Sequence, residues 1–248
     1  MSSTDPGKRL ATLIKRLRAR FGPALADDPP NSPSWIDPLV DELIYSCLLW
    51  EATTSQARNA FKRLKDAYID YNELRVGLPE ETAAVLGERY PRGEERAARL
   101  RAILFDLYQR EYAVSLSSQV DGGKRDTRSY LESLDGIPPF VVDRMMLIRF
   151  GGHAVPTDER LAALLAANGV LSPSMTAQEA ASWLSRQIKA EDAHEVWPLL
   201  RAWSDEETPD SRKARQKASA SSDASSDERP QRRKPTATRR KAVKGGEA

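Results

Sequence analysis

Hydrophobic residues recur at intervals of three and four positions along most of the chain, and no segment alternates between apolar and polar residues with period two. The first spacing is typical of an amphipathic α-helix, whereas the second would indicate a half-buried strand. We therefore predict an all-α fold. The expected helices are Lys8–Phe21, one opened by Asp37-Pro38, one capped by Thr54 or Ser55, a short one near Pro79–Leu86, Glu94–Tyr112, three within 130–168, one behind a Thr176–Glu179 capping box, and a last one around Leu199. The segment Ser115–Arg128 is predicted to be a polar loop.

Two segments lack the helical spacing. Residues 22–35 are rich in proline and are predicted to connect two lobes. Residues 207–248 are poor in apolar side chains, so they cannot bury enough surface to become ordered. From Ser211 onward the chain has twelve Lys and Arg against four Asp and Glu, whereas the preceding residues carry a net charge of −6. We predict an acidic body followed by a disordered basic tail that binds nucleic acid.

Composition narrows the class of protein further. The 248 residues, 40% of them hydrophobic, suit one or two domains plus a tail. No apolar run reaches the roughly 18 residues of a membrane span, and we expect no secretory signal and no membrane contact. A single cysteine, Cys47, excludes an internal disulfide and a four-cysteine cluster, and it is expected to be a buried thiol. His153 and His194 show no metal-ligand spacing, so we expect no metal and no cofactor. The expected protein is a cytoplasmic monomer, associated with the nucleoid if it is bacterial.

The most informative stretch runs from Leu131 to Leu165 and predicts a helix, a tight hairpin, a second helix, a loop and a third helix. Gly136 follows an aspartate in the turn and can take the positive φ that a hairpin needs. Amides at a hairpin before a helix start can bind a phosphate, and we assign this role to Gly136, Ile137 and Pro139. Asp158 opens the third helix, where the amides that it caps favour a charged carboxylate. The stretch therefore predicts a site that binds a backbone phosphate next to the carboxylate of Asp158.

This stretch resembles the helix-hairpin-helix-GPD superfamily of DNA glycosylases, the endonuclease III-like proteins. The family pattern is a hairpin L-P-G-hydrophobic-G-x-K, an apolar helix, and V-D opening the next helix. Here residues 134–140 (LDGIPPF) occupy the hairpin and 156–158 (PTD) the aspartate turn. Residues 41–53 (DELIYSCLLWEAT) resemble the family's first helix, which ends L-L-S-x-Q-x-T. The resemblance covers about 37–169 and implies a two-lobed fold, DNA with a damaged base as the ligand, and Asp158 as the catalytic carboxylate.

The sequence departs from the family pattern at several positions. The lysine that bifunctional members use as a Schiff-base nucleophile is Phe140 here, so β-lyase activity should be absent. The second hairpin glycine is Pro138, which has no amide to offer a phosphate. The glutamine that fills the DNA helix falls at Glu51, and the catalytic glutamate of mismatch-adenine members falls at Cys47. The four-cysteine iron–sulfur loop is missing.

Most of these candidates also have an ordinary structural interpretation. Asp158 can be a simple helix cap, and the hairpin can be a plain turn between helices. Phe140 is a candidate to stack on an extruded base or to fill the core. Trp50 and Glu51 lie where the family inserts a side chain into the space left by a flipped base; Trp50 is otherwise a core residue, and Glu51 either contacts a base or is solvated surface. Six basic residues cluster in sequence around the hairpin: Lys124, Arg125, Arg128, Arg144, Arg149 and Arg160. They are either phosphate contacts, a role that we assign above all to the first three, or ordinary charges on exposed helix faces.

We predict that residues 1–206 form a glycosylase-like domain, with a central lobe over 37–154 and a second lobe made of 1–36 and 155–206. The leading hypothesis is an enzyme of base-excision repair, a monofunctional DNA glycosylase that uses Asp158 to hydrolyse the N-glycosidic bond of a damaged base. The first alternative is a catalytically inactive DNA-binding protein on the same fold. The second is a helical protein-interaction module with an unrelated basic tail.

Overall fold

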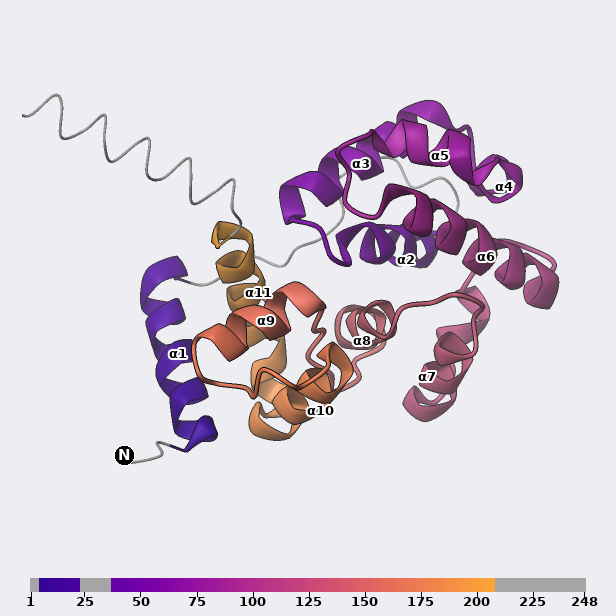
Figure 1. The fold of residues 1–248 in the computed structure, drawn as a ribbon. Helices are drawn as coiled ribbons and strands as arrows, with labels where there is room; N and C mark the ends of the chain where they lie inside the picture. The colour runs from indigo at the N-terminus through magenta and orange to yellow at the C-terminus, as the bar shows by residue number, and fades with distance from the viewer. Residues whose placement is uncertain (1–4, 23–36, 208–248) are drawn as a thin grey trace, which may run out of the picture. The chain divides into compact units, whose positions relative to one another are not determined.

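The computed structural model describes residues 5–22 and 37–207, and these residues form eleven α-helices, one short 3-10 helix and no strand (Figure 1). The predicted all-α class is confirmed. The helices are α1 Pro6–Phe21, α2 Pro38–Leu49, α3 Thr54–Ala67, α4 Tyr71–Val76, α5 Pro79–Leu86, α6 Gly93–Glu111, α7 Lys124–Glu132, α8 Pro139–Ile148, α9 Glu159–Ala167, α10 Ala177–Gln187 and α11 Ala190–Glu206. The predicted connector over 22–35 and the predicted tail lie outside the described residues, except for Gly22 and Glu207.

Side-chain caps account for several helix starts. Asp37 accepts a hydrogen bond from the Leu39 amide and precedes Pro38 in the first turn of α2, as predicted. Thr53, rather than Thr54 or Ser55, caps α3, because its side chain and that of Gln56 form a reciprocal capping box. The predicted capping box at the start of α10 is also formed.

Two short elements differ from the prediction. The supposed loop Ser115–Arg128 contains the 3-10 helix Ser117–Gln119 and the first half of α7, whose only buried side chains are Thr127 and Leu131. Helix α4 was not predicted; it has six residues and buries Tyr71 and Leu74. Helix α4 has too few residues to show a helical period, and the first half of α7, Lys124–Arg128, contains no apolar side chain that could indicate a helix.

The packing of the helices explains where the core lies. Helices α2 to α6 contact one another, α1 and α9 pack on α11, and α10 packs on α9. Helix α8 contacts α2, α7 and α11, and its apolar face is almost completely buried. The chain order and these neighbours can be followed in Figure 1. None of the described helices is both long and apolar enough to cross a membrane.

A buried charge cluster joins α2 to α8. Glu42 and Arg144 are both fully buried and form an ion pair, and Ser46 accepts a hydrogen bond from the same guanidinium at 2.7 Å. Arg149 donates to the other carboxylate oxygen of Glu42 through Nε at 2.7 Å. Both arginines therefore link α8 to α2: Arg144 is buried and forms no basic surface, whereas Arg149 is exposed but already paired with Glu42.

Candidate active site at the start of α9

Asp158 is the N-cap of α9, and its side chain is only 1% exposed. Its Oδ1 accepts a hydrogen bond from the Leu161 amide at 2.9 Å, which is the ordinary capping contact. Its Oδ2 accepts from the Glu51 amide at 3.2 Å and from Arg201 Nη1 at 3.3 Å. Three donors from three parts of the chain therefore compensate the charge of this carboxylate. Asp158 caps α9, as one interpretation of the sequence required.

Three arginines hold the turn that follows α2. Arg96 donates to the Trp50 carbonyl, and Arg160 and Arg201 both donate to the Ala52 carbonyl. Arg201 also reaches the Leu49 carbonyl at 3.2 Å. These carbonyls lie at the negative end of the α2 dipole, where cations are favoured. The turn is therefore fixed from α6, α9 and α11 at once.

Glu51 is the residue that this turn presents. Its φ is +56°, in the left-handed region that a non-glycine residue rarely adopts. Its Oε1 accepts a hydrogen bond from the Glu159 amide at 2.7 Å, so the carboxylates of Glu51 and Asp158 both lie at the N-terminus of α9. Burial and the neighbouring charge of Asp158 raise the pKa of Glu51. Unlike Asp158, Glu51 is only partly buried, so it is the carboxylate of this pair that solvent reaches.

Trp50 lies beside Glu51 in a cationic environment. It is partly buried and packs against the core. The guanidinium carbons of Arg92, Arg96 and Arg99 lie 5.0, 5.9 and 5.2 Å from the centre of its ring, within the range of a cation–π interaction. The ring therefore combines a core contact with a positively charged surround.

The hairpin between α7 and α8 adopts the predicted turn, but few of its backbone amides are available to bind a phosphate. Gly136 has a φ of +75° and packs against α6, where its carbonyl accepts a hydrogen bond from Arg99 at 2.7 Å. The Ile137 amide donates to the Leu134 carbonyl at 3.3 Å, and neither Pro138 nor Pro139 has an amide hydrogen. Of the three residues assigned to phosphate binding, only Gly136 keeps an amide without an acceptor among the described residues.

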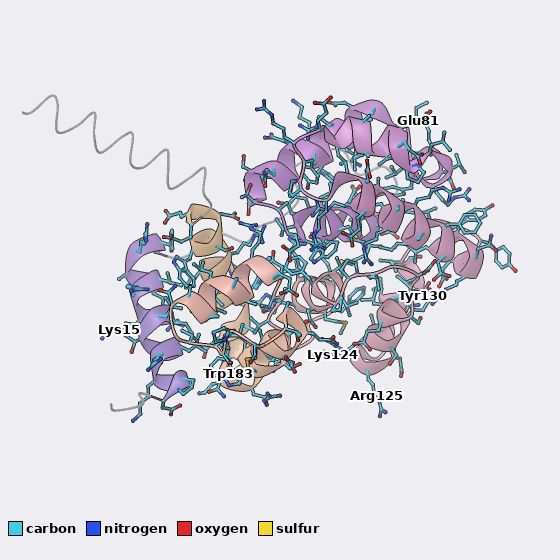
Figure 2. All side chains as sticks on the ribbon, viewed as in Figure 1. Lys15, Glu81, Lys124, Arg125, Tyr130 and Trp183 are labelled. Carbon is cyan, nitrogen blue, oxygen red and sulfur yellow. The ribbon has the colours of Figure 1, made fainter. Side chains whose placement is uncertain are left out.

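The three predicted phosphate contacts, Lys124, Arg125 and Arg128, differ in whether other groups of the protein already bind their side chains. Lys124 donates to the Gly151 carbonyl at 2.5 Å, whereas the side chain of Arg125 points away from α7 (Figure 2). Arg128 pairs with Glu132 at 3.1 Å and with Asp143 at 2.7 Å, so carboxylates already compensate its charge. A cavity of about 320 Å³ borders the hairpin; it is lined by Arg128, Glu132, Ile137, Pro139, Val142 and Asp143 with Gln178 and Ser182 of α10.

Two further candidates lie in the core. Phe140 is 3% exposed and belongs to the main hydrophobic cluster, as its core interpretation requires. Cys47 is 2% exposed, and burial raises the pKa of its thiol to about 12, which leaves it protonated and unreactive as expected. The described residues contain no group of three or more His, Cys, Asp or Glu side chains arranged to hold a metal ion.

Arg96 and Arg201 were not identified from the sequence as site residues. A signal was present in each case. Arg96 continues the stripe of Leu100, Ile103 and Leu107 on α6, and Arg201 lies four residues after the buried Trp197 on α11. An arginine on the apolar face of a helix needs buried acceptors. The carbonyls of Trp50 and Pro91 accept from Arg96, and Asp158 and the carbonyls of Leu49 and Ala52 accept from Arg201.

Comparison with solved structures identifies the fold. A trapped endonuclease III–DNA covalent intermediate matches with a TM-score of 0.59 and 15% identity, over 79% of this chain and 84% of that chain. The Clostridium acetobutylicum 8-oxoguanine glycosylase/lyase in complex with DNA matches with a TM-score of 0.57 and 13% identity, over 79% and 68%. The H. pylori 3-methyladenine DNA glycosylase bound to 1,N6-ethenoadenine matches with a TM-score of 0.52 and 13% identity, over 82% and 94%.

No family model matches the sequence, and no curated protein sequence matches it significantly. The likeness is therefore one of structure at low sequence identity, and it concerns the fold. The chain has the helix-hairpin-helix-GPD fold of the DNA glycosylases, as its hairpin and aspartate turn predicted.

Proposed function

We propose that this protein is a monofunctional DNA glycosylase of base-excision repair, which hydrolyses the N-glycosidic bond of a damaged base in double-stranded DNA. The observation that carries the proposal is the position of Asp158: a charge-compensated carboxylate that caps the helix following the hairpin–helix unit, on a fold shared with DNA glycosylases. The DNA complexes among the similar structures support duplex DNA as the ligand.

The burial of Asp158 decides between two roles for a catalytic carboxylate, the activation of a water molecule and the stabilisation of the developing sugar cation. A side chain that is 1% exposed and engaged with three donors is poorly placed to take a proton from water. A negative charge fixed behind the reacting sugar needs no contact with water, and it stabilises the oxocarbenium-like cation that forms as the base leaves. We therefore assign Asp158 an electrostatic role.

In this proposal the enzyme hydrolyses the N-glycosidic bond and does not go on to cleave the DNA strand by a lyase reaction. A lyase step through a Schiff base needs a free amine at the sugar, and the position of the family's lysine holds Phe140, which lies in the core. Among the described residues, the contacts of Asp158 and Glu51 include no lysine. The product would be an abasic site in an intact strand.

Base release from duplexes that carry a panel of lesions tests the proposal. With the intact protein, we expect strand cleavage only after alkali treatment, and Asp158→Asn should lower the rate of release by about 100-fold or more, the usual cost of removing a preorganised electrostatic group. Glu191→Gln, an exposed carboxylate at the start of α11, is the control. Undiminished release by Asp158→Asn would refute the role of Asp158, and cleavage without alkali would refute the monofunctional assignment.

One observation favours a second function, a catalytically inactive DNA-binding protein on the same fold. The Asp158–Arg201 ion pair is buried on both sides, with side chains 1% and 5% exposed, as in a purely structural contact. This alternative predicts no base release on any lesion. It also predicts that removing the basic residues after Glu207 abolishes DNA binding, whereas Asp158→Asn leaves binding unchanged.

A further inference from the structure

Glu51 occupies an unusual backbone conformation at the end of α2. A glutamate with a φ of +56° is strained, and glycine or asparagine is the common residue where a helix ends in this way. Strained residues of this kind persist where their surroundings fix them, and they gather at functional sites. The arginines that hold the carbonyls of Leu49, Trp50 and Ala52 fix this turn, and Asp158 accepts the Glu51 amide itself.

The side chain of Glu51 is placed as firmly as its backbone. Oε1 accepts the Glu159 amide at 2.7 Å, while Oε2 has no hydrogen-bond partner among the described residues. Asp158 lies behind it, 1% exposed, whereas Glu51 is partly open to solvent. Of the two carboxylates at the N-terminus of α9, Glu51 is therefore the one that is open to a ligand from solvent.

The two carboxylates differ in their electrostatic surroundings. Asp158 has a guanidinium within 3.3 Å, and the described contacts of Glu51 include no ion pair. Burial, then the charges of Asp158 and Glu159, raise the pKa of Glu51 against the lowering effects of the Glu159 amide and of Arg92. Arg96 on α6 also faces Glu51, and Arg201 on α11 faces Asp158. A carboxyl group with a raised pKa beside an ion-paired, buried carboxylate is the usual arrangement of an acid beside a fixed charge.

From this geometry we infer that Glu51 is the general acid of the proposed reaction, and that the enzyme accordingly releases neutral damaged bases. The inference rests on the proposed function. As the C1′–N bond breaks, its electron pair stays on the base, and the carboxyl proton of Glu51 moves to a ring nitrogen of that base. The sugar cation faces the charge of Asp158, water adds to C1′, and the proton lost by this water restores the acid form of Glu51.

The inference sets a specific substrate preference. A base that already carries a positive charge, such as 7-methylguanine, leaves without help from an acid. A neutral base, such as hypoxanthine, leaves as an unstable anion unless it is protonated. The acid therefore matters for the second class alone, and comparing the two classes separates acid catalysis from a general loss of structure or DNA binding.

The experiment measures single-turnover release of hypoxanthine and 7-methylguanine from matched duplexes by the full chain, by Glu51→Gln and by Glu191→Gln. Glutamine keeps a carbonyl oxygen for the Glu159 amide, so the turn should be preserved. We expect Glu51→Gln to lower hypoxanthine release by about 100-fold or more while 7-methylguanine release changes less than about threefold. For the intact protein, hypoxanthine release should fall as pH rises through the pKa of Glu51, and Glu51→Gln should lose this dependence.

The outcomes separate the inference from the proposed function. Equal release of hypoxanthine by the intact protein and Glu51→Gln overturns the inference and leaves the glycosylase assignment standing. Equal losses on both lesions, or release of cationic bases only, also overturn it, because the residue would then be structural or the acid unnecessary. If no lesion of the broad panel is released, the proposed function itself fails, and the inference fails with it.

Discussion

Asp158→Asn should destabilise the protein as well as impair catalysis, and the size of this effect follows from the contacts of Asp158. The carboxylate has one oxygen on the Leu161 amide and the other on the Glu51 amide and Arg201. Asparagine has a single oxygen. With this oxygen on Leu161 the cap is kept at almost no cost, because Asn and Asp are similar N-caps. The new NH₂ group then faces two donors, and Arg201, 4% exposed, loses the carboxylate of Asp158.

Removing one partner of a buried ion pair costs about 3–5 kcal/mol. The lower end applies here, because Arg201 keeps the carbonyls of Leu49 and Ala52 and lies 3.7 Å from Asp205. We therefore expect a loss of about 3 kcal/mol, and about 1 kcal/mol more for Asp158→Ala, which also removes the cap. For a protein of this size, about 3 kcal/mol lowers Tm by roughly 6–12 °C.

Urea unfolding measures this prediction. Tryptophan fluorescence is a suitable probe, because the buried Trp197 donates to the Pro156 carbonyl at 3.0 Å, two residues before Asp158. Combining Asp158→Asn with Arg201→Gln should cost at least about 1 kcal/mol less than the sum of the single changes, since both remove the same interaction. A free energy of unfolding for Asp158→Asn within about 0.5 kcal/mol of the parent, or additive single changes, would refute the reasoning.

Two further predictions concern other charged groups. Glu42→Gln removes the carboxylate of the fully buried Glu42–Arg144 pair and should lower the free energy of unfolding in urea by about 3–5 kcal/mol. The control Glu191→Gln, at an exposed position, should lower it by less than about 0.5 kcal/mol. A loss below about 1 kcal/mol for Glu42→Gln would contradict the buried pairing. The raised pKa of Glu51 means that its favourable contribution is fully present below its unfolded pKa and is lost as pH rises through its folded pKa. Unfolding curves should therefore show Glu51→Gln gaining stability relative to the parent as pH rises from acidic to neutral, and an unchanged or opposite difference would count against the shift.

Much of the fold could be predicted from the sequence because the helices carry regular apolar stripes and recognisable caps. The Thr176–Glu179 capping box and the positive φ of Gly136 were both predicted from local sequence, and both are present. The hairpin and the aspartate turn together pointed to the glycosylase fold, which the structural comparisons confirm. Short elements such as α4 could not be predicted, because six residues give less than two turns of pattern.

The site was harder to predict because burial decides its chemistry, and burial depends on contacts between distant segments. Asp158 was identified from its place before α9, but its partner Arg201 lies 43 residues later, and Glu51 lies 107 residues earlier. Arg144 and Arg125 both lie near the hairpin in sequence, yet Arg144, on the apolar helix α8, is fully buried against Glu42, and Arg125 points away from α7 (Figure 2). Charge patterns therefore indicated a basic region, and only the packing showed which charges are already compensated.

The arginines around the end of α2 connect stability to the proposed chemistry. A glutamate in the left-handed region would ordinarily be replaced by glycine without loss, because glycine relieves the backbone strain. Here Arg96, Arg160 and Arg201 bind the carbonyls of this turn, so contacts other than those of the Glu51 side chain also fix its backbone conformation. The Glu51 side chain accepts a hydrogen bond from the Glu159 amide, and it is more exposed to solvent than Asp158. Glutamine would keep the contact with the Glu159 amide, so the ionisable carboxyl group of Glu51 is better explained by chemistry at that position than by packing.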